Sequence, residues 1–276
     1  MPREFLLCAK IPLINILTNQ EEFDKLVSIL IVCVLVTRLE VKAMAHIYSK
    51  RENTKMQIIK LATHLFMTEG YSKTTFGKMS RILDISPGNI TFYFSNKDSL
   101  LSVLVDELFD FQSKMMNQAA EEGKTSLLAY CLELTAIAVA CEESEIAREF
   151  YISSYTSPTT LNLIRKNDLS KTKEVFYEFC EDWSEEQWVE TENIVSGIEY
   201  AVITTRETET PLAVQISHTL NAIMLLYGVP KELREKKIEK VLSMDYRALG
   251  RRILNEFKAY IEAKNDDAYN ENIIGE

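Results

Sequence analysis

Residues that interrupt helices are scarce in this chain. Its 276 residues include only 8 Gly and 6 Pro, the two residues least compatible with a helix interior. The composition is otherwise 46% hydrophobic and 26% charged, which is typical of a soluble globular protein with a real core. The length corresponds to about two domains. The sequence therefore predicts an all-α fold.

Residues that bind metals or form disulfides are also few. The 5 cysteines are an odd number, and no two of them form a CxxC pair. The 3 histidines lie far apart in the sequence. These counts argue against a metal site and a disulfide framework, and they fit a reducing cytoplasm. We expect no metal, no cofactor and a cytoplasmic location.

Catalytic motifs and long apolar runs are missing as well. We find no glycine-rich phosphate loop and no nucleophile paired with a base, so we expect no enzyme. The longest apolar run, residues 26–36, has the sequence LVSILIVCVLV, whereas a membrane-spanning helix needs about 20 residues. Acidic residues at 21, 22 and 24 precede the run, where a signal peptide would carry basic ones. We expect neither a membrane span nor secretion.

Residues 1–43 form an atypical N-terminal extension. Because recognisable domain signals begin just after Met44, the leading hypothesis is that translation starts there and that 1–43 are a mis-annotated start. The alternative is a genuine extension that packs as a strand or short helix. A competing class of protein would use residues 26–36 as a helical membrane-associated or protein-interaction module.

Charge is distributed unevenly along the chain. The net charge is −10, which does not suggest a DNA-binding protein by itself. Residues 1–43 are neutral overall, 44–100 carry a net +4, and 101–276 carry a net −14. A small basic module therefore precedes a large acidic one. Contact with DNA phosphate needs positive charge at the binding surface and does not require a positive net charge on the whole protein.

Residues 44–100 show the signals of a small helical DNA-binding domain. Thr54 and Gln57 fit a capping box at the start of a helix that Gly70 ends. A second short helix begins after Thr74 or Thr75. Ser86 followed by Pro87 is a good start for a third. Two short helices joined by a tight turn, after a packing helix, predict a helix-turn-helix.

The remainder reads as a helical domain. A fourth helix starts at 96–98 and ends near residue 123, and six or seven further helices are expected. Residues 126–141 are apolar nearly all round, which predicts a central, buried helix. A helix is expected after Ser157-Pro158, with Asn167-Asp168 as a candidate break, and Ser184–Gln187 fits a second capping box. We assign 101–264 to a sensor and dimerisation domain and 265–276 to a frayed tail.

The helix-turn-helix segment resembles the DNA-binding domain of the TetR/AcrR family of transcriptional regulators. The similarity covers about 50 residues. The matching positions are Leu65, Phe66, Gly70, Tyr71, Thr74, Thr75, Ser86, Gly88, Ile90, Tyr93, Phe94, Asn96, Lys97, Asp98 and Leu100. Two positions depart from the family pattern: Asp84 replaces the turn glycine, and Thr91 replaces a tyrosine that commonly contacts phosphate.

The resemblance implies a ligand-responsive regulator, most simply a repressor that binds a palindromic operator as a dimer; an activator of the same fold is the alternative. Its partners would be double-stranded DNA, a second copy and an unknown small-molecule effector.

The expected DNA contacts divide into phosphate and base contacts. Phosphate would be contacted by hydroxyl and lysine side chains and base edges by residues near the start of the third helix. The candidates are Thr74, Thr75, Lys78, Ser86, Pro87, Asn89, Ile90, Thr91, Tyr93 and Lys97. Asn89 is the best single candidate, since Asn can pair with adenine. Ile90 contacts a thymine methyl or belongs to the core. Phe92 and Phe94 are expected in the core.

The dimer seam and the ligand cavity are assigned to the acidic domain. Apolar positions at helical spacing predict a seam formed by Ile194, Ile198, Ala201, Ile216, Leu220 and Ile223, with an intramolecular core as the alternative. Aromatic residues suited to lining a cavity are Tyr130, Phe150, Tyr151, Tyr155, Phe176 and Trp183. Glu133, Glu142 and Arg148 are candidates for orienting a ligand, and nothing in the sequence selects among them.

Overall fold

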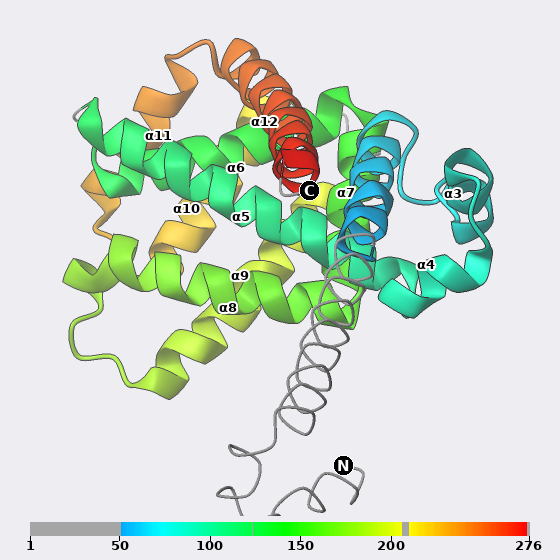
Figure 1. Ribbon diagram of the computed structural model, residues 1–276. Coiled ribbons are helices and arrows are strands. Elements are labelled where there is room, and N and C mark those ends of the chain that lie inside the picture. The colour runs from blue at the N-terminus through cyan, green and yellow to red at the C-terminus, as the bar shows by residue number, and fades with distance from the viewer. Residues whose placement is uncertain (1–50, 123, 206–209, 275–276) are drawn as a thin grey trace, which may run out of the picture. The chain divides into compact units, whose positions relative to one another are not determined.

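Short connections join a series of helices along the chain (Figure 1). The computed structural model describes residues 51–122, 124–205 and 210–274, and Thr54–Gly275 form one compact unit. Every regular element in these ranges is a helix, so the all-α prediction is confirmed. The predictions for residues 1–43 lie outside the described residues.

The helix-turn-helix is built from the elements that the sequence predicts. Residues 51–68 form the packing helix, and α3 (Phe76–Leu83) and α4 (Pro87–Tyr93) follow. Gly70 adopts φ +99°, and its N–H donates to the Leu65 carbonyl at 3.2 Å. A left-handed glycine of this kind ends a helix at low steric cost.

Nine further elements make up the rest of the described chain. They are α5 (Lys97–Glu121), α6 (Ser126–Glu143), α7 (Glu145–Thr156), α8 (Pro158–Phe176), the short 3₁₀ helix η1 (Tyr177–Phe179), α9 (Glu185–Thr204), α10 (Leu212–Leu226), α11 (Lys231–Leu242) and α12 (Tyr246–Ile274). The capping box predicted at Ser184 is present, with Ser184 and Gln187 each bonding the backbone N–H of the other.

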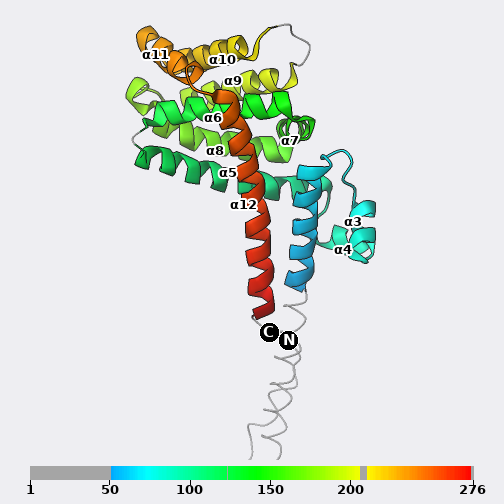
Figure 2. The same ribbon diagram turned by 90° about the horizontal axis from the view of Figure 1, so that it is seen from above.

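Helix α6 is central, as its apolar sequence predicts. Its buried residues face several sides, and α12 runs across it (Figure 2). The crossing is close at Gly250, where a Cβ atom would lie 2.6 Å from the Cβ of Val139. Only glycine therefore allows α12 this approach.

Two hydrophobic clusters fill the compact unit. One holds the core of the larger helical part around α6, α9 and α10. The other joins the helix-turn-helix to α5, α7, α8 and α12, through buried residues such as Ile90, Leu104, Phe150 and Phe257. Because α5 begins in the DNA-binding segment and continues into the larger part, the two share apolar packing.

Two local predictions are wrong. The first helix does not begin at Thr54, because residues 51–53 are already helical. Helix α8 is unbroken at Asn167-Asp168, where the Asp168 carbonyl accepts from Thr172 at 2.8 Å and the Asp168 carboxylate pairs with Lys171 at 3.1 Å. The tail predicted from residue 265 is assigned to α12 as far as Ile274, and fraying there stays a prediction. No helix in the described ranges is long and apolar enough to cross a membrane.

Candidate functional site

The turn between α3 and α4 depends on a left-handed residue. Asp84 has φ 53° and ψ 44°, and it is the one non-glycine residue with positive φ in the described chain. The next N–H, that of Ile85, donates to the Ser80 carbonyl at 3.0 Å. Asp tolerates this conformation better than most residues. The turn predicted despite the missing glycine is therefore formed.

Helix α4 is capped and points one face outward. The Ser86 hydroxyl accepts the Asn89 N–H at 3.2 Å, and Pro87 occupies the first helical position. Ile90 is fully buried and Phe94 is 6% exposed, so these two side chains anchor the helix. The exposed residues are Ser86, Pro87, Gly88, Asn89, Thr91 and Phe92.

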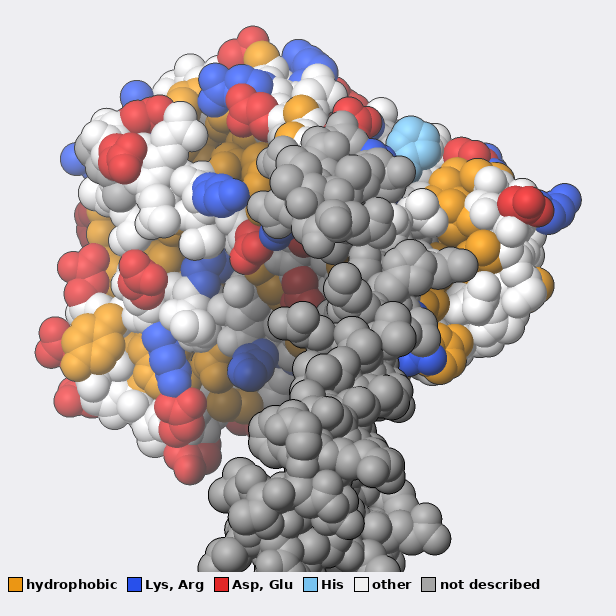
Figure 3. Space-filling model, in the orientation of Figure 1, with side chains coloured by type: hydrophobic (Ala, Val, Ile, Leu, Met, Phe, Trp, Pro, Cys, Tyr) orange, Lys and Arg blue, Asp and Glu red, His pale blue; other side chains and the backbone are white. Residues whose placement is uncertain are grey.

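Two predictions for α4 are corrected by this arrangement. Ile90 cannot reach a thymine methyl, because its side chain lies in the core. Phe92 is not core, since it is 67% exposed and packs edge-on against Tyr93, with ring centroids 5.0 Å apart. Figure 3 shows hydrophobic side chains at the surface of this part of the molecule. Helical periodicity explains both, because positions 90 and 94 share a face that position 92 opposes.

The two threonines before α3 have different environments. Thr75 is exposed and caps the helix by accepting the Lys78 N–H at 3.1 Å. Thr74 is fully buried, and its hydroxyl donates to the Gly70 carbonyl at 2.9 Å. The prediction that the Thr74 hydroxyl contacts phosphate is therefore wrong, because this hydroxyl is buried and already bonded to the protein backbone.

The two predicted phosphate-binding lysines are both half-buried. Lys78 pairs with Glu69. The Lys97 ammonium donates to the Tyr71 carbonyl at 2.8 Å and lies 3.8 Å from the centroid of the Tyr71 ring. Burial lowers the pKa of Lys97, and Glu149 and Asp98 partly offset this effect. An ammonium has three donors, so the bond to Tyr71 leaves donors for a phosphate.

Polar contacts join the helix-turn-helix to α7 and α8. The Glu149 carboxylate on α7 accepts the Ser72 N–H at 2.7 Å. At the start of α5, Asp98 accepts from the Tyr71 hydroxyl and from Ser157, which precedes α8, at 3.0 Å. The sequence carries no signal for these contacts, because they join positions up to 77 residues apart.

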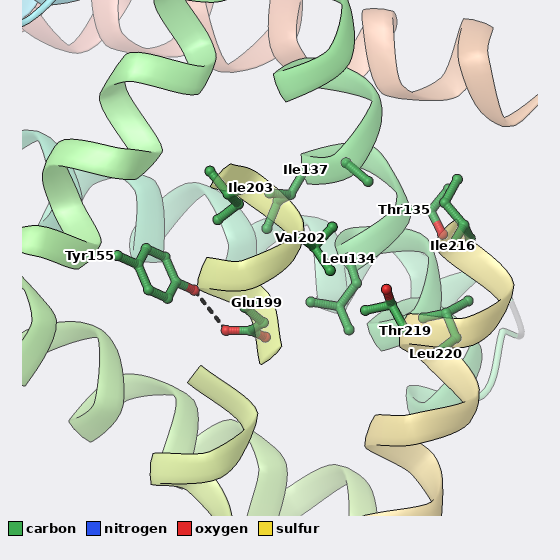
Figure 4. Close-up of a pocket in the computed structure, with 11 residues that line it drawn as sticks. Leu134, Thr135, Ile137, Tyr155, Glu199, Val202, Ile203, Ile216, Thr219 and Leu220 are labelled. Atoms are coloured by element: carbon green, nitrogen blue, oxygen red, sulfur yellow. Dashed lines mark hydrogen bonds between the residues drawn. The ribbon is translucent and has the colours of Figure 1, made fainter. Parts of the chain in front are cut away.

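A chain of cavities runs between the helices of the larger part. An outer cavity of about 200 Å³ lies among α5, α6 and α12. Two inner cavities of about 30 Å³ each lie beside it, one among α5, α6, α7 and α8 and the other between α6, α9 and α10. Ile137 lines all three. In the second inner cavity, the Tyr155 hydroxyl donates to Glu199 at 2.7 Å (Figure 4).

The structure separates the six predicted cavity aromatics. Tyr130, Tyr151 and Tyr155 line the first inner cavity. Phe150 and Phe176 are at most 2% exposed and pack in the two cores, and Trp183 packs against Trp188 and Tyr227. Phe150, Phe176 and Trp183 therefore serve packing in this structure.

Of the three polar candidates, Glu133 is placed to orient a ligand. It lines both the outer cavity and the first inner cavity. Glu142 is exposed and pairs with Arg247 at 2.7 Å. Arg148 donates to the Cys141 carbonyl at 2.9 Å. Glu199, which the sequence did not single out, lines both inner cavities.

The predicted dimer seam is half exposed and half buried. On α9, Ile194 is 53% exposed, Ala201 is exposed and Ile198 is partly exposed. On α10, Ile216, Leu220 and Ile223 are at most 2% exposed, so assigning them to the seam is wrong. The outer face of α10 instead carries Val214, His218, Asn221 and Leu225, all exposed.

Comparison with known proteins agrees with the geometry of the helix-turn-helix. Residues 58–104 match the family model described as "Bacterial regulatory proteins, tetR family". This part of the chain is thus a TetR-family DNA-binding domain, and the resemblance expected from the sequence is confirmed. A curated relative from Bacillus subtilis (strain 168), the probable HTH-type transcriptional regulator YttP, is 27% identical over 133 residues. The match spans 47% of this chain and 64% of that protein.

Solved structures resemble the chain more distantly. A gamma-butyrolactone receptor (ArpA-like protein) aligns with 75% of this chain and 99% of its own, at 16% identity and a TM-score of 0.40. The TetR family protein CprB from S. coelicolor A3(2) covers the same shares at 18% identity and a TM-score of 0.39. Similarity at this level carries no information on ligand or partner.

Proposed function

We propose that this protein is a ligand-responsive transcriptional regulator that binds a palindromic operator as a homodimer and represses transcription. The observation that carries the proposal is the outward face of α4. A capped helix is held by Ile90 and presents Asn89 and Phe92 away from the core. Asn can bond adenine with two hydrogen bonds, and an apolar ring can contact the thymine methyl.

Phosphate contacts come from the residues around this helix. Thr75, Lys78, Ser86, Thr91, Tyr93 and Lys97 supply hydroxyl and ammonium groups near α4. Ser86, Pro87 and Asn89 lie at its N-terminal end, which is the part of a recognition helix that meets base edges. Phosphate contacts fix the register of the helix, and the base contacts determine the sequence preference.

The homodimer forms through the outer faces of α9 and α10. These faces carry exposed apolar side chains, which are those of Ile194, Ala201, Val214 and Leu225. At Gly197 the face has open space for a partner helix. Large apolar side chains at the surface of an acidic protein mark an association site. Two helices from each copy would form a four-helix seam and set the spacing of about 34–36 Å between recognition helices.

Helix α7 connects the ligand cavities to the helix-turn-helix, so a bound ligand releases DNA by moving this helix. Tyr155 lines the inner cavities at one end of α7, and Glu149, further along the helix, holds the Ser72 backbone. The adjoining Ser157 binds Asp98 at the start of α5. A ligand that displaces Tyr155 therefore moves two contacts of the helix-turn-helix and shifts the population toward a dimer with the wrong spacing.

A genome-wide binding map combined with a reporter assay tests the proposal. We expect bound regions to share an inverted repeat upstream of regulated genes, and reporter expression to rise when the protein is deleted. A fall in expression would show activation instead. Binding without any shared motif would contradict the proposed regulator.

A further inference from the structure

Four carboxyl groups lie near one ammonium in the larger helical part. Glu192 is buried, and Glu133, Asp168 and Glu199 are partly buried. Lys171 on α8 lies 2.7 Å from Glu133 and 3.1 Å from Asp168. On α9, Glu199 bonds the Tyr155 hydroxyl at 2.7 Å, and Glu192 bonds the Tyr227 hydroxyl at 3.0 Å. The four carboxyl groups therefore outnumber the one ammonium group, that of Lys171. Buried charges are normally paired, so this excess needs an explanation.

The carboxyl groups line the inner cavities together with tyrosine rings. Glu133, Asp168 and Glu199 line the first inner cavity beside Tyr151 and Tyr155. Glu133 also lines the larger outer cavity, and Glu199 also lines the second inner one. Figure 4 shows Tyr155 directed at Glu199. Tyr151 lines the outer cavity as well. A molecule in the outer cavity would therefore meet the Glu133 carboxyl group and an aromatic ring together.

Some of these oxygens have no partner in the protein. Oε2 of Glu133, which lines the cavities, is buried without a hydrogen bond. Glu192 is 2% exposed, and its Oε1 also has none. The Gln112 Oε1, at the same two cavities as Glu133, is a third unpaired acceptor. Buried acceptors without donors are costly, so a bound molecule that supplies positive charge would be favoured.

We propose that these cavities bind an organic cation with a flat aromatic body. This inference rests on the proposed ligand response and names the chemical class of the effector. The carboxylates attract the charge, and the rings of Tyr130, Tyr151 and Tyr155 attract it through their π faces. An anion would meet like charge, and a neutral molecule would leave the carboxyl groups uncompensated. Each inner cavity, at about 30 Å³, is little larger than the 10–15 Å³ or so that one water needs. An aromatic ligand therefore enters them only by widening them.

The ionisation of the cluster agrees with this proposal. Burial raises the pKa of Glu133 and Glu199, and it raises the pKa of Glu192 to about 7. The groups that face Glu199 are Asp168 and Lys171 on α8, Glu192 on α9 and Tyr155 on α7. A bound cation lowers these carboxyl pKa values and releases protons. Its affinity therefore increases as the pH rises through the raised pKa values of these carboxyl groups.

Three ligands of matched shape test the charge preference on the full-length protein. N-methylacridinium is a fixed cation, acridine is neutral at pH 8, and acridine-9-carboxylate is an anion. Binding is measured by titration calorimetry and by quenching of Trp183 and Trp188. We expect the cation to bind at least tenfold more tightly than the other two at pH 8, and more weakly at pH 6. Equal binding of all three, or preference for the anion, would overturn the proposal.

Isosteric variants locate the site. Glu133→Gln and Glu199→Gln should each weaken cation binding about tenfold and leave acridine binding unchanged. Glu174→Gln, which changes an exposed carboxylate on α8, should have no effect. Unchanged cation binding in both cavity variants would contradict the site. If a variant does not fold, as judged by circular dichroism, the ligand series on the natural protein decides alone.

A DNA-binding measurement separates this inference from the proposed function. If the protein binds an operator and another class of molecule releases it while N-methylacridinium does not bind, the cation proposal fails and the regulator remains. If N-methylacridinium binds with the expected charge preference but no specific DNA is found, the regulator fails and the cation site remains.

Discussion

Asp84 holds the turn of the helix-turn-helix in a backbone conformation that most residues avoid. Its φ of 53° lies in the left-handed region, where glycine meets no steric cost and a β-branched residue is strained. The turn directs α4 so that Ile90 points inward and Asn89 outward. A change at position 84 therefore acts on stability and on DNA binding together.

Substitution of Asp84 separates backbone conformation from side-chain chemistry. Asp84→Gly should keep or slightly raise the free energy of unfolding, whereas Asp84→Val should lower it by about 1–2 kcal/mol. Urea denaturation measures both values. If the valine variant matched the natural protein in stability, the left-handed turn would not be needed.

Asn89 and Lys97 should affect DNA binding differently. Asn89→Ala should relax preference at one base pair at a cost of about 1–3 kcal/mol. Lys97→Ala should weaken binding to all sequences and lower the salt slope by about one unit. Competition binding with single-base-pair operator variants at several salt concentrations measures both. A uniform loss for Asn89→Ala would show that it contacts phosphate and not a base.

For single residues, the sequence predicts which side chains cap helices better than it predicts which side chains face the core. Ser86 and Ser184 cap their helices as expected, and of the two threonines considered Thr75 is the cap, because a cap depends only on the next three residues. Thr54 is the exception, since it lies inside the first helix. The burial of Thr74 depends on what packs above it, and such contacts come from distant parts of the chain that a local motif cannot supply. The exposure of Phe92 instead follows from helical periodicity once Ile90 and Phe94 face the core.

At the scale of helices, α9 and α10 carry the surface proposed for the dimer. Ala201→Glu combined with Val214→Glu places charge on both outer faces. We expect this double variant to be a folded monomer that loses most of its affinity for the palindrome, because two half-sites can no longer be bound together. Light scattering with size-exclusion chromatography measures the mass.

The control for the dimer prediction changes charge at another exposed position. Glu121→Lys changes an exposed residue of α5, a helix that carries none of the proposed interface residues, and should leave the mass unchanged. A double variant that remains dimeric would move the interface elsewhere.

The extent of each helix was partly visible in the sequence. The apolar pattern predicted α6 as the buried centre, and both α9 and α10 were expected at their observed places. The pattern could not distinguish the inner stripe of α10 from its outer one, because Ile216, Leu220 and Ile223 are as apolar as a seam would be. Their burial shows that α10 first serves the core. Likewise, the pairing of Asp168 with Lys171 keeps α8 continuous where the sequence suggested a break.

For the whole molecule, the buried acidic cluster should make stability depend on pH. Burial raises the pKa of Glu192 from its usual 4.5 to about 7, so the folded state holds this proton more tightly than the unfolded state. The free energy of unfolding should therefore fall as the pH rises from about 4.5 to about 7. The contribution of Glu192 is about 3 kcal/mol.

Glu192→Gln tests this dependence, because glutamine cannot ionise. We expect the variant to lose less stability than the natural protein between pH 5 and pH 8 in urea denaturation, while Glu174→Gln follows the natural protein. Parallel stability curves for Glu192→Gln and the natural protein would show that Glu192 does not titrate in this range.

Sequence-specific binding of DNA by a dimer is the property of the whole molecule on which the proposed function depends. The most direct measurement is a titration of the natural protein against its mapped operator and a scrambled duplex of the same composition, at one stated salt concentration. We expect affinity for the operator to be about 10³-fold tighter or more, with protection of two half-sites about one helical turn apart or a multiple of it. Equal affinity for the two duplexes would contradict the proposed regulator.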